Sequence, residues 1–367
     1  MSYLLHCNGL LGFCVALYNL VFEIEQMVFA VRAAHGHGTG TTFKRNGASF
    51  APHQHAAQRS TVSFKDKMTP IAALQAAAMP ELYSSMPSSP QINVLYLAPG
   101  QEIISPEQFR ASNPEILATG AGTQLAKMSP SMLVKYGTHA SLIEAKNMLY
   151  VAERTSIPIP RLFAAYAYGP LDRDVDDFGS VYDTYIFMEF IEGEDLGKSW
   201  GKYTPIEKQT ISTDLKKHIT ELRSLPPANY IGSVYEGPVT DVILEWSTTS
   251  RGPFKSEGDF NATIADTFIA KSKGQVGPYI RGMVNTHKHG IVFTHGDLRP
   301  DNIIVKNGRV IAIVDWEMAG WYPDYWEFVK ALHLEVFTND WASHLLGVLT
   351  PYYCEQLIHA KLMSVLW

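Results

Sequence analysis

A short segment in the C-terminal third of the chain combines residues that can bind a metal ion with one that can accept a proton. Residues 295–302 read His-Gly-Asp-Leu-Arg-Pro-Asp-Asn, and the triplet Asp315-Trp316-Glu317 follows them. Carboxylate and amide oxygens are the ligands that Mg²⁺ prefers, and Mg²⁺ usually also keeps waters and substrate phosphates. A further carboxylate beside a phosphate-bound metal can accept a proton from an attacking hydroxyl. These residue types indicate phosphoryl-transfer chemistry.

A predicted β-hairpin should position these residues. Two apolar, strand-like runs are joined by Asn307-Gly308, the strongest short-range hairpin signal, because both residues accept the positive φ of a type I′ turn. Antiparallel pairing would bring Asn302, which enters the first strand, beside Asp315, which leaves the second. We expect Asn302 and Asp315 to hold Mg²⁺ and Asp297 to lie in the loop nearby. Asp and Asn also cap turns, but three of them on one hairpin favour a site.

The stretch from Thr294 to Glu327 resembles the aminoglycoside phosphotransferase family, its fungal-type members above all, and the related choline kinases with their protein-kinase-like fold. The pattern His-Gly-Asp-Leu-x-Pro-x-Asn matches throughout residues 295–302. The resemblance implies ATP and Mg²⁺ as cofactors, Asp297 as catalytic base, and Asn302 and Asp315 as metal ligands. Protein kinases differ, with an arginine before the catalytic aspartate and Asp-Phe-Gly in place of Asp-Trp-Glu. A small-molecule acceptor is therefore favoured over a protein.

Other residues in this stretch have less defined roles. Glu317 resembles the acidic residue that follows the metal aspartate in choline kinases and fungal-type members, and a carboxylate at a helix start is the equal alternative. His295 is expected to be a structural turn residue and not a catalyst. The aromatic residues of the segments 320–323 and 325–327 extend the likeness, and we expect them to pack in the core.

The N-terminal half should supply a lysine for the nucleotide. Lys135 stands alone among apolar neighbours in a strand-like run, and it resembles the family lysine that contacts the α- and β-phosphates. A strand lysine that reaches solvent is the alternative. Glu144 on the following helix is the expected partner, with Glu153 in reserve. However, Ser141 and Glu144 also fit a capping box.

A glycine turn and a hinge complete the predicted nucleotide site. Gly120 and Gly122 can form a turn over the phosphates, since glycine permits close approach of the backbone; an ordinary hairpin turn is the alternative. The run that ends at Gly193 resembles the last strand and the hinge between lobes. Backbone groups near Glu189 and Ile191 are expected to meet the adenine.

The element pattern predicts an α+β, two-lobed, protein-kinase-like fold. Strand-like runs and one helix, at about residues 141–154, indicate a small antiparallel-sheet lobe. A capping box with proline at the first helical position, Thr204 to Glu207, then opens a helical half. The expected parts are a hydrophobic N-terminal segment (1–32), a low-order linker (33–100), a nucleotide-binding N-lobe (101–193), and a catalytic and acceptor-binding C-lobe (194–367).

The first 22 residues contain no Asp, Glu, Lys or Arg, which is near the length that spans a bilayer. They lack the positive start and clear cleavage site of a signal peptide. A membrane anchor, an extra helix on the body, or a segment absent from the working protein are the open interpretations. We expect a cytoplasmic protein, with membrane anchoring as the alternative.

The composition limits the classes of binding partner. The net charge of −6 argues against nucleic acid, because backbone binding needs a basic face, and a monomer is expected. The four histidines between residues 35 and 55 lie in the predicted linker without a scaffold, so a solvated segment is favoured over a metal site. Acidic residues beyond the hinge, Glu192, Glu194 and Asp195, would suit a cationic acceptor such as an amino sugar or a choline-like amine. A nucleotide-binding regulatory pseudokinase and a protein kinase are the competing functions.

Overall fold

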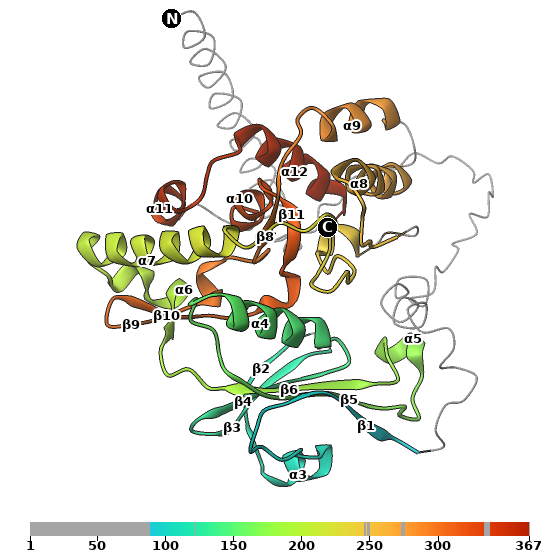
Figure 1. The fold of residues 1–367 in the computed structure, drawn as a ribbon, viewed down its shortest axis with the longest axis vertical. Coiled ribbons are helices and arrows are strands. Elements are labelled where there is room, and N and C mark those ends of the chain that lie inside the picture. The colour runs from blue at the N-terminus through green and yellow to red at the C-terminus, as the bar shows by residue number, and fades with distance from the viewer. Residues whose placement is uncertain are drawn as a thin grey trace, which may run out of the picture. The chain divides into compact units, whose positions relative to one another are not determined.

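The computed structural model describes residues 89–366 except 121, 246, 248–249, 273–275 and 334–337, and excepting the side chains of 176 and 177. The predicted hydrophobic segment 1–32 and most of the predicted linker lie outside these residues. Figure 1 shows the described chain as a sheet-bearing N-lobe, a helical C-lobe, and helix α4 between the sheet and the C-lobe. This arrangement confirms the predicted two-lobed α+β fold.

The N-lobe is built on a six-stranded antiparallel sheet of strand order β1-β5-β6-β4-β3-β2. A helix covers each face: Phe109 of α3 packs on Tyr136 and Tyr185, and Ala145 and Met148 of α4 pack in the core on the other side. The elements are β1 Gln91–Leu97, α3 Pro106–Ala111, β2 Glu115–Thr119, β3 Gln124–Ser129, β4 Met132–Gly137, α4 Leu142–Arg154, β5 Leu162–Gly169, α5 Val175–Phe178 and β6 Asp183–Glu189.

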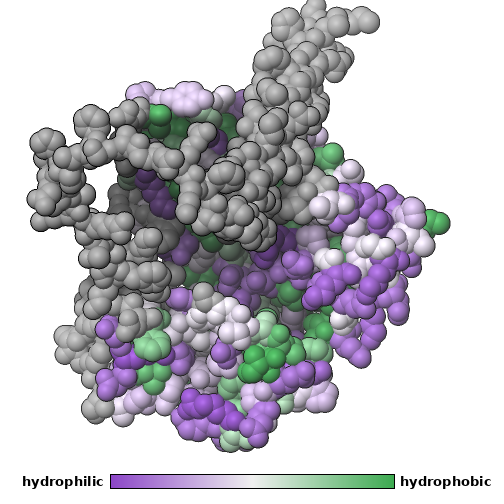
Figure 2. Space-filling model, turned by 180° about the vertical axis from the view of Figure 1, so that it is seen from behind, coloured by the Kyte–Doolittle hydropathy of each residue, from purple (hydrophilic) through white to green (hydrophobic). Residues whose placement is uncertain are grey.

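Strand β1 corrects the predicted lobe boundary. It lies within the range expected to be a low-order linker (33–100), yet it pairs with β5 from Gln91↔Gly169 to Leu97↔Ala164. Because β1 is an edge strand, most of its residues are exposed. Polar and apolar residues alternate from Gln91 to Val94, a short strand signal that the predicted boundary left out. Val94 and Leu97 of β1 are exposed. Figure 2 shows hydrophobic residues on the surface of this lobe. The N-lobe therefore begins before residue 101.

The C-lobe combines helices with two small sheets, of order β10-β9-β7 and β11-β8. Its longest helix, α7, begins with the predicted capping box: Thr204 Oγ1 accepts from the Glu207 N–H, and Glu207 accepts from the Thr204 N–H. The elements are β7 Glu194–Asp195, α6 Leu196–Ser199, α7 Pro205–Arg223, α8 Glu257–Lys271, α9 Gly277–Val284, β8 Ile291–Thr294, β9 Ile303–Lys306, β10 Arg309–Ile313, β11 Gly320–Pro323, α10 Trp326–Ala331, α11 Trp341–Val348 and α12 Tyr353–Leu366.

The hairpin of β9 and β10 forms as predicted. Asn307 and Gly308 have φ values of 53° and 69°, as a type I′ turn requires. At the open end of the hairpin the Val314 N–H donates to the Asn302 carbonyl at 2.9 Å. Pairing of the strands thus places Asn302 next to the segment that carries Asp315.

The hinge between the lobes lies against this hairpin. A Cβ at Gly193 would lie 2.6 Å from Ile304 Cγ2 and 2.9 Å from the Val305 carbonyl oxygen. Any side chain there would push the hinge away from β9, so glycine allows the chain to pass from β6 into the C-lobe at close range.

No helix among the described residues is both long enough and apolar enough to cross a membrane. The charge-free segment 1–22 lies outside that part of the chain, so its predicted roles remain predictions.

The type I′ turn gives a stability prediction. In Gly308→Ala a Cβ enters the left-handed region, which costs roughly 1–2 kcal/mol, so the free energy of unfolding measured with urea should fall by about that amount. Gly201→Ala is the matched control, because no atom lies within 4 Å of the added Cβ and its φ is not in the left-handed region. Equal destabilisation by the two substitutions would contradict the turn assignment.

Candidate active site

Lys135 of β4 lies at the centre of a cluster of carboxylates drawn from both lobes. Its Nζ lies 2.7 Å from Glu144 Oε2 on α4, 2.8 Å from Asp315 Oδ1 and 2.9 Å from Glu317 Oε2. The lysine and Glu144 are buried. The alternative of a strand lysine that reaches solvent is therefore wrong, and the cluster joins residues up to 182 positions apart.

The contacts of Glu144, Glu153 and Glu317 show which of these side chains reach Lys135. Glu144 points to Lys135, while the N-cap Ser141 accepts from the Ile143 N–H without a capping box. Glu153 lies at the exposed end of α4 and pairs with Arg154. Glu317 lies in a short helical turn, Trp316–Met318, and its side chain contacts Lys135, so it belongs to the charged cluster.

Burial and mutual repulsion shift the ionisation of this cluster. Burial alone would lower the pKa of Lys135, but the three carboxylates outweigh it and hold that pKa well above the ordinary value. Burial raises the pKa of Glu144 to about 8; attraction to Lys135 opposes the rise, and repulsion from Asp315 and Glu317 adds to it. Burial also raises the pKa of Glu317. Three carboxylates around one ammonium leave excess negative charge, which a bound cation would neutralise.

A buried amide fixes the segment that carries Asp315. Asn147 of α4 is fully buried, and its Nδ2 donates to the carbonyls of Trp316 at 2.8 Å and Ala319 at 2.9 Å. Asp315 itself adopts the left-handed conformation, with φ 66° and ψ 64°, which is uncommon outside glycine. Asn147 therefore helps to hold the backbone in the conformation that turns Asp315 toward Lys135.

The loop before β9 brings Asp297 and Asn302 together. Asn302 Nδ2 donates to both the carbonyl and the Oδ2 of Asp297, each at 2.8 Å. Arg299 Nε lies 2.9 Å from Asp297 Oδ1. The Asp297 carboxylate is thus held from two sides, and the amide oxygen of Asn302 is left as the oxygen that can ligate a metal.

His295 has a structural place, as expected. It is fully buried, its Nδ1 accepts from the Asp297 N–H at 3.2 Å, and its Nε2 lies 3.0 Å from the Val314 carbonyl. Below it, Glu327 of α10 accepts from the backbone N–H groups of His295 and Gly296 at 2.7 and 3.2 Å. These bonds connect the loop that carries Asp297 to the hairpin and to α10.

The predicted glycine turn and hinge are present in the N-lobe. Gly120 and Gly122 lie between β2 and β3, and Gly122 has φ +75° and no room for a Cβ beside His139. At the hinge the Glu189 N–H donates to the Arg161 carbonyl. Contact of either segment with a nucleotide remains a prediction.

The acidic residues beyond the hinge each lie near a lysine. Glu192 lies 3.1 Å from Lys306, Glu194 lies 2.8 Å from Lys202, and Asp195 both pairs with Lys198 and caps α6. Exposed ion pairs are weak, so a role of these residues in binding a cationic acceptor remains a prediction.

Three supporting residues were missed from the sequence: Asn147, Arg299 and Glu327. For Asn147 a signal existed, since it lies three residues after Glu144 on the same face of the helix and is polar on a face otherwise apolar. For Glu327 there was none, because its contacts to residues 31 and 32 positions away depend on tertiary packing.

Lys135 of the sheet lobe contacts Asp315 of the helical lobe, and Asp297 and Asn302 lie together in the loop before β9. These residue types are the ones expected in a kinase-like phosphotransferase. The sequence profile described as "Phosphotransferase enzyme family" matches residues 112–359, which is more than half of the chain. The chain therefore belongs to the phosphotransferase enzyme family. The predicted enzyme class and the resemblance at family level are confirmed.

Three solved structures that the chain resembles are distant from it in sequence. The ADP-bound aminoglycoside phosphotransferase APH(2'')-Ib is 15% identical, with coverage of 68% of this chain and 80% of that one and a TM-score of 0.45. The streptomycin–ATP complex of APH(2'')-IIa is 13% identical, with coverages of 71% and 87% and a TM-score of 0.44. An aminoglycoside-3'-phosphotransferase of type VIII is 15% identical, with coverages of 79% and 98% and a TM-score of 0.43. No curated protein matches the chain at a significant level.

The Asn147 tether predicts a stability loss. Asn147→Ala removes the side-chain donor from the Trp316 and Ala319 carbonyls, which costs roughly 1–3 kcal/mol, and this loss should appear in urea unfolding. Lys146→Ala, at the adjacent, partly exposed position of α4, is the control and should stay within about 0.5 kcal/mol of the parent. If the free energy of unfolding falls no further in Asn147→Ala than in the control, Asn147 does not stabilise the segment that carries Asp315.

The carboxylate cluster predicts a pH dependence of stability without nucleotide or divalent cation. The pKa of Glu144 is raised on folding to about 8, so the folded chain binds more protons than the unfolded chain between about pH 4.5 and 8. The contribution of Glu144 to the free energy of unfolding therefore falls as the pH rises through that window. In Glu317→Gln one repulsive charge is lost, and the decline should shrink by about 1 kcal/mol, the equivalent of somewhat less than one pKa unit.

Urea midpoints at pH 5, 6, 7 and 8 measure this effect. Glu153→Gln, at the exposed end of the same helix, should follow the parent curve at every pH. If the stability of Glu317→Gln changes with pH in parallel with that of the parent, Glu317 does not influence the ionisation of Glu144.

Proposed function

We propose that this enzyme transfers the γ-phosphate of ATP, with Mg²⁺, to a hydroxyl group of a small molecule, with Asp297 as the base. The observation that carries the proposal is the contact of Lys135 with Asp315 at 2.8 Å. This contact supports a shared role for the nucleotide-lobe lysine and the hairpin carboxylate at the phosphate groups. Family membership supports the reaction class.

The donor set fits Mg²⁺. The Asp315 carboxylate and the Asn302 amide supply oxygens from the two strands at the open end of one hairpin, and Mg²⁺ prefers a few protein oxygens together with waters and phosphates. The excess negative charge of the cluster around Lys135 favours a cation in the same place. When bound, the metal would neutralise charge on the phosphates.

Other residues of the chain would bind the phosphates and accept the proton. Lys135, oriented by Glu144, would contact the phosphates of the nucleotide. The Asp297 carboxylate, held by Asn302 and Arg299, would accept the proton of the acceptor hydroxyl. Positioning of this kind supplies most of what phosphoryl transfer asks of a protein.

The hinge suggests how the adenine would bind. The N–H groups of Glu189 and Phe190 already donate to the carbonyls of Arg161 and Ser131. The Glu189 carbonyl and the Ile191 N–H are therefore the backbone groups that we assign to the adenine, with the Gly120–Gly122 turn over the phosphates.

The proposal of a small-molecule acceptor rests on family membership and on the sequence differences from protein kinases. An amino sugar or a choline-like amine, each of which carries a hydroxyl, is the favoured kind. Streptomycin and gentamicin occur in solved structures of similar fold, and they belong with choline, simple sugars and a peptide in a test panel.

Substitution of the proposed base tests the function. Asp297→Asn should lower phosphate transfer to the best acceptor of the panel by roughly 10²–10⁴-fold and should leave ATP binding nearly unchanged. Asp301→Asn is the matched control, since it makes the same change in the same loop on an exposed residue. Radiolabelled γ-phosphate from ATP measures transfer, and calorimetry measures nucleotide binding.

Two results would count against the proposal in different ways. Tight ATP/Mg²⁺ binding without transfer to any acceptor would favour the regulatory pseudokinase. Transfer that Asp297→Asn leaves intact would refute the base assignment while keeping the enzyme.

A further inference from the structure

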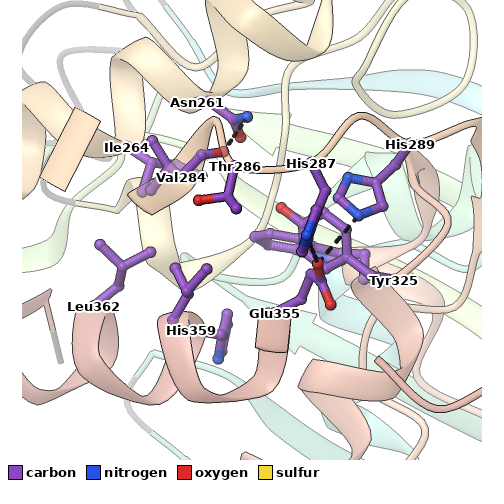
Figure 3. Close-up of a pocket in the computed structure, with 12 residues that line it drawn as sticks. Asn261, Ile264, Val284, Thr286, His287, His289, Tyr325, Glu355, His359 and Leu362 are labelled. Carbon is purple, nitrogen blue, oxygen red and sulfur yellow. Dashed lines mark hydrogen bonds and ion pairs between the residues drawn. The ribbon is translucent and has the colours of Figure 1, made fainter. Parts of the chain in front are cut away.

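Away from Lys135 and the hairpin, two histidines and a glutamate of the C-lobe converge on one point. His287 and His289 lie between α9 and β8, and Glu355 lies in the first turn of α12. Glu355 Oε1 lies 2.5 Å from His287 Nδ1 and 3.5 Å from His289 Nε2. Figure 3 shows both imidazoles pointing toward this carboxylate. The three ligand atoms lie within 4.8 Å of one another.

A second carboxylate fixes the orientation of His289. Glu257, the first residue of α8, accepts from the His289 backbone N–H at 3.0 Å and lies 2.7 Å from the ring Nδ1. This double contact favours the tautomer with the proton on Nδ1, which leaves the Nε2 lone pair facing Glu355. Metal-binding histidines are held in this way, with one ring nitrogen bonded to a carboxylate and the other directed at the metal.

The charges around His289 leave a place for a cation. A neutral imidazole has one N–H and one lone pair, yet both ring nitrogens of His289 face a carboxylate. The lone pair on Nε2 would therefore point at a negative oxygen unless a proton or a metal ion lay between them. The side chains of His289, Glu257 and Glu355 are each at most 13% exposed, so water screens this repulsion poorly.

We propose that His287 Nδ1, His289 Nε2 and Glu355 Oε1 bind a divalent transition-metal ion of the Zn²⁺ type, with Glu257 as the supporting carboxylate. Two histidines and one glutamate are a known zinc donor set, with Zn–N and Zn–O distances of about 2.0–2.2 Å. Tetrahedral ligand atoms then lie about 3.3 Å apart. The observed 3.5 Å separation fits this value, and the half-exposed His287 can move outward by the remaining fraction of an ångström.

A small cavity beside the cluster offers room for a fourth ligand. It has a volume of about 30 Å³, enough for one water molecule. His359, one helical turn beyond Glu355 on α12, lines the same cavity. It is buried, and among the described residues neither of its ring nitrogens has a hydrogen-bond partner. Burial holds the pKa of His359 well below its ordinary value, so this side chain adds a neutral, unsatisfied imidazole to the cavity wall.

Bound metal would fasten three segments that are distant in sequence: the start of α8, the loop before β8, and the start of α12. Strand β8 leads directly into His295 and Asp297. The ion would therefore be structural: it would stabilise the base of the catalytic loop without contacting the reacting groups.

Zinc titration of the full chain tests this site. The five histidines outside the described residues (His6, His35, His37, His53 and His55) are replaced by asparagine, and Cys7 and Cys14 by serine, in every sample. Mg²⁺ is kept in excess, so that neither these side chains nor the magnesium site can account for zinc uptake. Calorimetry should show one Zn²⁺ per chain, and saturating Zn²⁺ should raise the melting temperature by about 5 °C. Co²⁺ in place of Zn²⁺ should give the visible absorption of a tetrahedral site.

Three variants separate a built site from adventitious binding. Glu257→Gln should weaken zinc binding roughly 10–100-fold, and His287→Ala should weaken it at least as much while the metal-free melting temperature stays unchanged, because His287 is half-exposed. Lys288→Ala, between the two histidines and exposed, should bind like the parent. Zinc uptake that His287→Ala and Glu257→Gln leave intact, or no uptake at micromolar zinc, overturns the proposal.

Discussion

The contact of Lys135 with carboxylates from both lobes is the interaction on which the rest of the structure depends. A buried ammonium is tolerated only when charged partners surround it, and loss of one partner of a buried pair typically costs about 3–5 kcal/mol. Glu144 supplies that partner from α4, and Asp315 and Glu317 supply it from the hairpin. The position of α4 between the sheet and the C-lobe follows from this requirement (Figure 1).

The cluster also explains why buried polar groups surround the hairpin. Asp315 has an uncommon backbone conformation, and such conformations persist only where neighbouring contacts over-determine them. Asn147 holds the carbonyls after Asp315, and Glu327 holds the N–H groups before Asp297. Each of these side chains hydrogen-bonds to backbone groups of the two loops, and buried backbone groups are rarely left without partners. The two loops that carry the proposed chemistry are therefore fixed before any ligand binds.

Local sequence signals predicted a large part of this arrangement. The Asn307-Gly308 turn and the capping box of α7 act through contacts within a few residues, so their outcomes can be deduced from the sequence. Strand β1 carries only a short signal of this kind, the alternation from Gln91 to Val94, and its pairing with β5 is what makes it part of the N-lobe. The lysine partner of Glu192 was hidden from the sequence, because Lys306 pairs with it across 114 residues of chain.

The sequence by itself determined the reaction class and the order of the site residues, because Asp297, Asn302 and Asp315 keep a fixed spacing around one hairpin. Tertiary structure decided which carboxylates surround Lys135, that Glu144 is its helix partner, and that Glu317 joins the cluster. It also brought His287, His289 and Glu355 together, although Glu355 lies 68 residues beyond His287. The physical reason is the same in each case: charge pairing acts over a few ångströms in space, and only packing of the elements sets which residues meet at that distance.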